Sequence, residues 1–480
     1  MATPRFTAEE ALALAQRAFF EDAVAATALP SYDDQNWKIT TASGRCIVLK
    51  IAASGADCRD CAGPSETLAG IEFEHEAMMR VASQGVICPE PLPVQLTTRT
   101  QAEGEDLVAV ATSTVLRVRR ANGGDGINFV RAITFLPGEH LSAHLESYAL
   151  KDGGSDASQV LAGAASRTLE KVGAACALAG AALANWEPGV AGRRTLVWDL
   201  ASAPSSAAHL DLVPQEPVAE GGGASSEGGG NRELAARWIR RFARALALPG
   251  SDMGSPSEDS DDISLVDLPA QVIHGDLNDC NILVADDSIS TTTMTEGIGV
   301  LDFGDAVRCA FLFTLGTAPR PHPQTQSLFF ALLQVWTKRI YDLAIALAYA
   351  CQPFGADGEA TLAAAIATVR GYRMAQLHLQ SLPSCEPTCD GGSSSSSKAP
   401  PRILPLTPDE AAALPLCVAG RLCQSVLTSA ASVAADPSNA EYLSVSAKPG
   451  WRLLRTWDAL HASGRLKALV DAATGTAYGA

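Results

Sequence analysis

The sequence predicts an α+β fold with two lobes: a small amino-terminal β-sheet lobe, residues 1–137, and a larger, mainly helical carboxy-terminal lobe, residues 138–480. Three observations predict this order. Short runs rich in β-branched residues dominate the first lobe. Pro137-Gly138 is a turn signal that ends them. Beyond it, long segments with helical spacing of apolar residues prevail, and one group of short strands between residues 271 and 301 interrupts them.

The expected elements follow in chain order. Residues 45–51 are typical of a buried strand, and residues 72–84 of a helix that Gly85 stops. Two further runs, 107–118 and 129–136, are β-rich. The expected helices of the second lobe are 157–184, 231–248, 340–350, 358–380, 408–434 and 449–461. Low-complexity or aperiodic stretches predict flexible inserts near 204–231, 250–264, 308–339 and 384–402.

Composition limits the class of partner. The 480 residues contain 36 Lys+Arg and 53 Asp+Glu, a net charge of −17, and no basic run, so we expect no nucleic-acid partner. We also expect no membrane span and a cytoplasmic location, because no apolar run approaches the roughly 18–20 residues of a bilayer span and the acidic amino terminus suits no targeting signal. The CxxC pair at 58–61 is more typical of a loop than of a metal site. Oligomeric state is not predicted.

Two polar loops, each mounted on a short strand, carry the chemistry. In VIHGDLNDCNILV, residues 272–284, an apolar strand runs into a loop that presents His274, Asp276 and Asn281 and then returns to a strand. In GVLDFGD, residues 299–305, a strand ends in Asp302 and Asp305. His-x-Asp-x-x-x-x-Asn followed by Asp-Phe-Gly is the spacing of kinase catalytic and metal loops. Taken singly, each of these residues could equally be explained as a turn or helix-cap residue. The two loops together, in this order, favour phosphoryl transfer.

Phosphoryl transfer needs a carboxylate to receive the acceptor proton and hard oxygen ligands for Mg²⁺. We expect Asp276 to be that carboxylate, Asn281 and Asp302 to be metal ligands, and Asp305 to hold a second ion or its water. His274 is grouped with the catalytic residues, but we expect it to brace the loop by hydrogen bonding rather than to transfer a proton.

A kinase also needs a Lys on an amino-terminal strand, paired with a Glu on the next helix, to hold the nucleotide phosphates. Lys50 lies in the expected strand. Glu72 and Glu76 share one helical face, with Glu74 on another, and we favour Glu76 slightly over Glu72. No GxxxxGK[ST] motif occurs, so a P-loop is not expected. The Gly-rich GxGxxG loop of protein kinases is also missing, and residues 29–37, which stand in its place ahead of the Lys50 strand, are either a phosphate-binding turn or a plain hairpin.

With these residues placed, the sequence resembles the aminoglycoside phosphotransferase family, which has the protein-kinase-like bilobal fold. The resemblance spans nearly the whole chain. It is carried by LPSYDDQNW (29–37), IVLKI (47–51), ITFLPG (133–138), VIHGDLNDCNILV (272–284), GVLDFGD (299–305), and RLCQSVLTSA and YLSVSAKPGW near the carboxyl terminus.

The resemblance implies a kinase that uses Mg²⁺ and a nucleotide donor. The stretches SYDDQN and HGDLNDCN are more specific than the pattern shared by the whole family. They resemble members that transfer the γ-phosphoryl of GTP to the side-chain hydroxyl of 5-hydroxy-L-lysine, giving 5-phosphohydroxylysine and GDP. Asp276 falls on the family's catalytic Asp, Lys50 on its phosphate-binding Lys, and Asn281 with Asp302 on its metal ligands. Thr134, Phe135 and Leu136 fall on the segment whose backbone would meet the nucleobase, and nothing in them separates GTP from ATP.

Two alternatives stay open. A kinase of this fold acting on another hydroxylated amine, such as choline, homoserine or an aminoglycoside, with ATP or GTP, would fit the same loops. A non-catalytic, nucleotide-binding pseudokinase is disfavoured by the intact motif residues. Asp33, Asp34 and Asp279 are conceivable ammonium partners of a cationic substrate, but we assign none of them.

One departure from the family concerns residues 308–339. In the family only a few residues separate DFGD from the helix that resembles 341–346, whereas here a stretch with a Pro-His-Pro cluster intervenes. It is either a lineage insert or an intron retained in the gene model. We favour the retained intron, because the stretch is neither a polar surface loop nor a periodic helix.

Overall fold

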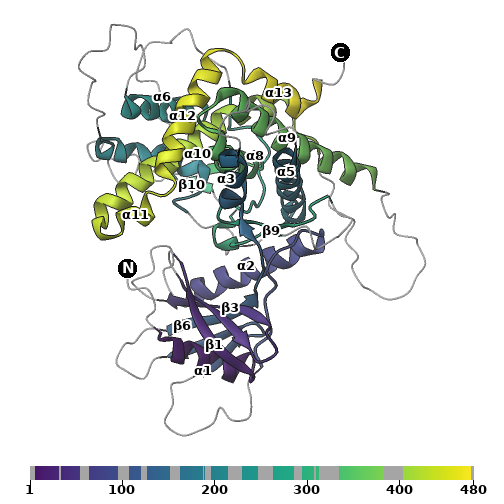
Figure 1. Ribbon diagram of the computed structural model, residues 1–480, viewed down its shortest axis with the longest axis vertical. Coiled ribbons are helices and arrows are strands. Elements are labelled where there is room, and N and C mark those ends of the chain that lie inside the picture. The colour runs from purple at the N-terminus through teal and green to yellow at the C-terminus, as the bar shows by residue number, and fades with distance from the viewer. Residues whose placement is uncertain are drawn as a thin grey trace, which may run out of the picture. The chain divides into compact units, whose positions relative to one another are not determined.

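The computed structural model describes most of the chain (Figure 1). The described residues are 6–31, 34–54, 64–95, 108–119, 127–151, 163–187, 189, 196–214, 230–246, 263–285, 294–307, 310–312, 334–382 and 404–476. Most of the expected inserts, the CxxC pair at 58–61, and Tyr32 and Asp33 lie outside them. The chain forms two compact units. Unit 1 comprises Met1–Ser83, Ile87–Pro137 and Gly189–Arg194, and unit 2 comprises Gln84–Val86, Gly138–Pro188 and Thr195–Ala480.

Unit 1 is built on a six-stranded antiparallel sheet with strand order β1-β2-β3-β6-β5-β4. Helix α1 and helix α2 lie on opposite sides of this sheet (Figure 1). The elements are α1 (Ala8–Ala18), β1 (Ala23–Leu29), β2 (Gln35–Thr41), β3 (Cys46–Ser54), α2 (Pro64–Ser83), β4 (Val108–Thr112), β5 (Val115–Arg119) and β6 (Ile127–Thr134).

Alternation along the strands decides which side chains meet which helix. In β3, Ile47, Leu49 and Ile51 point into the core that α1 covers, each fully buried. Ala52 points to the other face, where it packs with Ile71 of α2. Burial of each large apolar side chain contributes roughly 1.5–3 kcal/mol. Because Lys50 shares the parity of Ala52, the sheet directs it to the α2 face.

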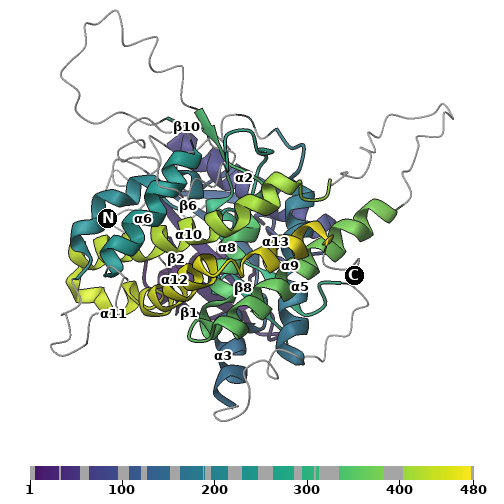
Figure 2. The same cartoon turned by 90° about the horizontal axis from the view of Figure 1, so that it is seen from above.

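Unit 2 is mainly helical and contains a small antiparallel sheet of order β7-β8-β9. Figure 2 shows its helices grouped around α8 and α10, and every residue of α8 is buried. The elements are β7 (Glu139–His140), α3 (Leu141–Lys151), α5 (Ala164–Leu183), η2 (Leu200–Leu212), α6 (Asn231–Ala245), β8 (Ile282–Val284), β9 (Ile298–Val300), η3 (Phe303–Asp305), β10 (Ala310–Leu312), β11 (Gln334–Trp336), α8 (Ile340–Ala350), η4 (Gln352–Phe354), α9 (Gly358–Ser381), α10 (Pro408–Ala435), η5 (Pro437–Asn439), α11 (Ala440–Leu443), α12 (Ala447–Ala462) and α13 (Lys467–Thr474). The α+β class expected from the sequence is confirmed.

Two of the expected inserts, 204–231 and 308–339, contain residues that are ordered parts of unit 2. Residues 204–212 form part of η2, in which Ser206 is buried. At the end of 308–339, the Lys338 Nζ donates to the carbonyl oxygens of Val266 (2.7 Å) and Leu268 (3.1 Å). Arg339 forms a two-bonded ion pair with Glu410, which is fully buried. The last residues of this expected insert are therefore held within unit 2, and its middle, 313–333, lies outside the described residues.

Helix α10 spans Pro408–Ala435, close to the expected 408–434, but it is more apolar than the sequence analysis allowed for. By length and composition it could cross a membrane, with a mean hydropathy of 1.4 over its most apolar window. However, 89% of that window is buried inside the structure. The apolar composition is accounted for by this burial, as in a core helix.

Helices α5 and α9 cross at two glycines, one on each helix. A Cβ at Gly173 would overlap the carbonyl oxygen of Thr368, and one at Gly371 would overlap that of Glu170. Glycine costs up to about 1 kcal/mol relative to alanine within a helix. Here it allows the two backbones to approach more closely than any side chain would permit.

We expect Gly173→Ala to lower the free energy of unfolding by about 1–3 kcal/mol, because neither helix can retreat from a backbone overlap without loss of packing. Gly180→Ala, on the same helix, is the matched control: its Cβ would lie 3.5 Å from the nearest atom, the Gln271 Nε2. It should be neutral or slightly stabilising. Denaturant unfolding of both variants measures the difference, and equal effects would contradict the crossing as its cause.

Candidate active site

The two polar loops of unit 2, which contain Asn281 and Asp302, meet at one end of the strand pair β8–β9. Strands β8 and β9 pair antiparallel, with Ile282 opposite Val300. Asn281, just before β8, and Asp302, just after β9, therefore lie at the same end of this pair. The Leu301 amide donates to the Asn281 carbonyl oxygen (2.8 Å), and Ile273 forms a bridge with Val307. The sheet thus brings together the loops that are 21 residues apart in sequence between Asn281 and Asp302.

A buried carboxylate on α8 fixes the first turn of residues 274–281, the segment that carries Asp276 and is called the catalytic loop below. The two oxygens of Asp342 accept hydrogen bonds from the backbone amides of His274 and Gly275, each 2.9 Å long. Gly275 has φ +85°, and a Cβ there would overlap the carbonyl oxygen of Asp305. Glycine is therefore required by both the backbone conformation and the space. The close approach ties the catalytic loop to the DFGD loop.

His274 braces the loop, as expected from the sequence, through both ring nitrogens. Its Nε2 lies 2.9 Å from the Leu301 carbonyl oxygen, which only accepts, and its Nδ1 receives the Asp276 amide at 3.3 Å. These partners require the neutral tautomer with the proton on Nε2. Burial lowers the pKa of His274 and favours the same neutral form. With both nitrogens engaged, we assign His274 a positioning role.

Asp276 is held by three side-chain donors. Its Oδ2 accepts from the amide nitrogens of Asn278 (2.7 Å) and Asn281 (2.8 Å), and its Oδ1 from Arg421 Nη2 (2.5 Å). Burial raises the pKa of Asp276, the Arg421 guanidinium opposes this rise, and Asp302 adds to it. The carboxylate is therefore oriented by its three donors, and orientation is the first requirement for a base that acts on an acceptor hydroxyl.

Asn281, Asp302 and Asp305 offer a set of oxygen donors that suits Mg²⁺. The Asn281 amide nitrogen donates to Asp276, so its oxygen is the atom left for a metal. Asp302 adopts φ +50°, a conformation that residues other than glycine rarely adopt, and such strain is concentrated at functional sites. Among the described residues no cluster of three or more His, Cys, Asp or Glu forms a metal site. The metal role of Asn281, Asp302 and Asp305 stays a prediction.

In unit 1, Lys50 belongs to a buried charge cluster on the α2 face of the sheet. Lys50 is 8% exposed and lies opposite Arg131 in the β3–β6 register. Two cations at this separation repel, and two carboxylates offset the repulsion. Asp34 Oδ2 lies 3.8 Å from the Lys50 Nζ and 3.1 Å from Arg131 Nη2, while Glu74 Oε2 lies 2.9 Å from Arg131 Nη2.

The structure does not place Glu72 or Glu76 beside Lys50. Glu72 is exposed, and Glu76 forms an i,i+4 ion pair with Arg80 at 2.6 Å. The buried glutamate of α2 is Glu74, which the sequence analysis had set on the other face. The reason is the orientation of α2: the face that carries Ile71 and Glu74 packs on the sheet, and the face with Glu72 and Glu76 does not.

The segment expected to meet the nucleobase follows strand β6. Thr134 closes the strand: its amide donates to the Glu90 carbonyl oxygen (3.0 Å), and its Oγ1 accepts from the Glu90 amide (2.9 Å). The Lys38 Nζ lies 4.3 Å from the centroid of the Phe135 ring. Thr134, Phe135 and Leu136 are all partly exposed. Their role toward a nucleobase stays a prediction.

Three residues at the loops were not singled out from the sequence: Arg421, Asp342 and Asn278. Asn278 Oδ1 accepts the amides of Cys280 (2.8 Å) and Asn281 (2.9 Å), which shapes the loop between Asp276 and Asn281. Arg421 had two available signals: it is the sole Arg or Lys of the apolar segment 408–435, and it begins RLCQSVLTSA, one of the stretches that carry the resemblance. A cation in a buried helix needs a partner, and Asp276 is that partner.

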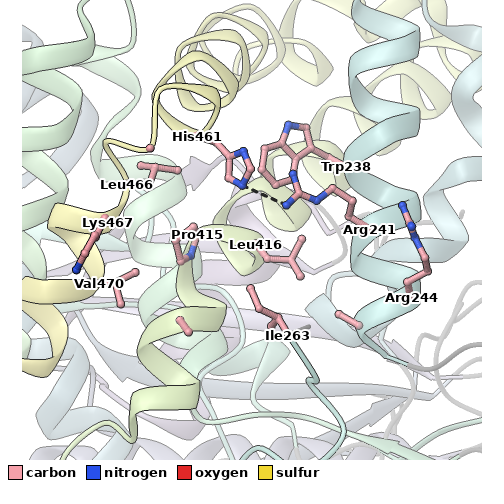
Figure 3. A pocket seen from close by; sticks show the side chains of 13 residues that line it. Trp238, Arg241, Arg244, Ile263, Pro415, Leu416, His461, Leu466, Lys467 and Val470 are labelled. Carbon is pink, nitrogen blue, oxygen red and sulfur yellow. Dashed lines mark hydrogen bonds between the residues drawn. The ribbon is translucent and has the colours of Figure 1, made fainter. Parts of the chain in front are cut away.

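A separate cavity of about 750 Å³ lies between α6, α10, α12 and α13 (Figure 3). Arg241 stacks on the Trp238 ring (4.7 Å to its centroid) and donates to the His461 Nε2 at 3.1 Å. The residues of α10 that line it, Ala412, Pro415 and Leu416, are on the helix face opposite Arg421, given 3.6 residues per turn. The cavity is therefore not part of the Asp276 site.

Comparison with known proteins assigns the family. Residues 25–317, more than half of the chain, match the phosphotransferase enzyme family. The chain belongs to this family. The match contains Lys50, Asp276, Asn281 and Asp302, and the resemblance expected from the sequence is confirmed. The protein is a phosphotransferase that acts on a hydroxyl group.

Individual relatives are distant. The chain is 24% identical over 470 residues to hydroxylysine kinase of Mus musculus, covering 95% of this chain and 90% of the relative, and 24% identical over 464 residues to that of Bos taurus, covering 94% and 89%. Among solved structures it is similar to the amicoumacin kinase hAmiN, in complex with AMP-PNP, Ca²⁺ and Ami (12% identity, TM-score 0.47, covering 95% and 94%), and to an ethanolamine kinase of Plasmodium vivax (10% identity, TM-score 0.40, covering 91% and 82%). These two likenesses are too distant to inform on substrate.

The charge cluster of unit 1 generates a pH prediction through His75. Burial, reinforced by Arg131 and Lys50, lowers the pKa of His75 from 6.5 to about 3. Because the unfolded chain takes up the proton near pH 6.5 and the folded protein does not, stability is lost as the pH falls from 6.5 toward 3. His75→Gln, which lacks this titration, should lose about 2–3 kcal/mol less than the wild type between pH 7.5 and 4.5. Urea unfolding at both pH values measures the difference, and parallel losses would contradict it.

Proposed function

We propose that this protein is a kinase that transfers the γ-phosphoryl group of GTP to the side-chain hydroxyl of 5-hydroxy-L-lysine, giving 5-phosphohydroxylysine and GDP. The observation that supports this acceptor is the similarity to hydroxylysine kinases along 95% of the chain. The geometry of the Asp276 loop supports the chemistry, because an oriented carboxylate stands at the sheet edge next to oxygen donors suited to a divalent cation.

The proposed reaction is a single displacement at phosphorus. The acceptor O–H bond breaks and its proton passes to Asp276, a bond forms between the acceptor oxygen and the γ-phosphorus, and the bond to the β–γ bridging oxygen breaks to release GDP. Mg²⁺ held by Asn281, Asp302 and Asp305 would offset the negative charge on the phosphates. In unit 1, the Asp34 carboxylate, which also pairs with Arg131, holds the side chain of Lys50, the residue that the family resemblance assigns to the nucleotide phosphates. His274 and Asp342 hold the loop that carries Asp276.

Nucleoside diphosphate release with GTP and, separately, ATP over a panel of 5-hydroxylysine, lysine, choline, homoserine and kanamycin tests the proposal. We expect turnover with GTP and 5-hydroxylysine and none with lysine, which lacks the acceptor hydroxyl. Turnover with another amine and not with 5-hydroxylysine would contradict the proposed acceptor but would leave the proposed kinase activity standing. Nucleotide binding without turnover on any acceptor would favour a non-catalytic protein.

The assigned roles of Asp276 and Asp302 predict different defects. Asp276→Asn should lower kcat by about 10²–10⁴-fold with nearly unchanged nucleotide affinity, because the carboxylate acts on the acceptor proton in the transition state. Asp302→Ala should abolish the Mg²⁺-dependent part of nucleotide binding, measured by calorimetry with and without Mg²⁺. Small and equal effects of the two substitutions would be incompatible with these roles.

A further inference from the structure

The hydrogen bonds to Asp276 distinguish its two carboxylate oxygens. Each carboxylate oxygen can accept about two hydrogen bonds. Oδ2 already accepts two, from Asn278 (2.7 Å) and Asn281 (2.8 Å). Oδ1 accepts one, from Arg421 Nη2 (2.5 Å). The remaining capacity of this carboxylate is therefore on Oδ1.

Arg421 is itself fixed within unit 2 and is 1% exposed. Its Nη1 donates to the carbonyl oxygen of Trp198 (2.8 Å) and to Gln424 Oε1 (3.1 Å). Its guanidinium lies 5.1 Å from the ring centroid of Trp198 and 5.5 Å from that of Tyr349. A planar guanidinium held in this way can transfer its orientation to a carboxylate, which a mobile ammonium cannot do as well.

Gln424 in turn holds the side chain of Arg421 in place. Its Nε2 donates to the carbonyl oxygens of Val197 (2.8 Å) and Asp199 (2.9 Å), so the amide oxygen is turned toward Arg421. Arg421 and Gln424 are three residues apart on α10 and lie on one face of the helix. The rotamer of Arg421 is thus set by the packing of α10 against residues 197–199.

We propose that Arg421 is a positioning residue that orients the Asp276 carboxylate so that Oδ1 receives the proton of the acceptor hydroxyl. The inference rests on the proposed phosphoryl transfer and does not depend on which hydroxylated amine is the acceptor. Asn278 and Asn281 occupy Oδ2, and Arg421 holds one side of Oδ1. The acceptor hydroxyl is received on the other side of Oδ1, and its proton ends on that oxygen.

Substitution of Arg421, in the full-length protein with the acceptor that the wild type uses, tests this role. Arg421→Lys keeps a cation but loses the fork, and Arg421→Ala loses both. We expect kcat to fall by about 10²-fold in each, with the KM for nucleotide changed less than threefold, because a misoriented base affects the chemical step. Methylguanidinium added to Arg421→Ala should restore part of kcat.

Arg339→Lys is the matched control, since Arg339 also forms a buried ion pair with a carboxylate, that of Glu410. We expect it to lower Tm while kcat stays within threefold of the wild type. Folded Arg421 variants with kcat within threefold of the wild type would overturn the positioning role and leave the proposed function standing. A wild type without turnover on any acceptor would instead remove the proposed function, and this role with it.

If both Arg421 variants fail to fold, Asn278→Asp tests the other oxygen. The new carboxylate can still accept the amides of Cys280 and Asn281 but repels Oδ2. The proposal expects a fall in kcat of about tenfold or more, and an unchanged kcat contradicts it. A crystal structure with acceptor and a non-hydrolysable nucleotide gives a direct answer: the acceptor hydroxyl should contact Oδ1, and contact with Oδ2 alone overturns the assignment.

Discussion

The candidate active site depends on one buried carboxylate, that of Asp342. It accepts both backbone amides at the start of the catalytic loop. Buried amides need such acceptors, and here a single side chain on a fully buried helix supplies both. The turn at Gly275, the bracing by His274 and the contact with the DFGD loop all follow from this anchor. The loop therefore takes its shape from the core of unit 2 rather than from its own sequence alone.

Both units face the same electrostatic problem, because each holds a charged group away from water. An isolated buried charge is costly, and each pair must offset its desolvation by good geometry. In unit 2, Asp276 gains a guanidinium and two amide donors. In unit 1, Lys50 and Arg131 share the carboxylate of Asp34, and Glu74 completes the neutralisation. These networks fix the directions of the charged side chains as well as offsetting their charges.

Sequence reasoning succeeded where the signal was local. The α+β order and the two strand-mounted loops could be read from short runs and spacing, because strand, turn and polar residue are adjacent in the chain. It could not place Glu74, because helical periodicity shows which glutamates share a face but not which face packs on the sheet. Arg421 lies 145 residues from Asp276, and only the packing of α10 brings them together. Nor could composition show that residues 337–339 are held within unit 2 at the end of a stretch that was expected to be a flexible insert.

The position of Arg421 within the chain bears on how variants of this protein should be interpreted. The motif residues, Lys50, Asp276, Asn281 and Asp302, all occur before residue 303. A premature stop or a frameshift between codons 303 and 421 would leave every one of them intact and still remove the cation that faces Asp276. The truncated protein would contain all four motif residues, but its Asp276 carboxylate would lack the guanidinium of Arg421.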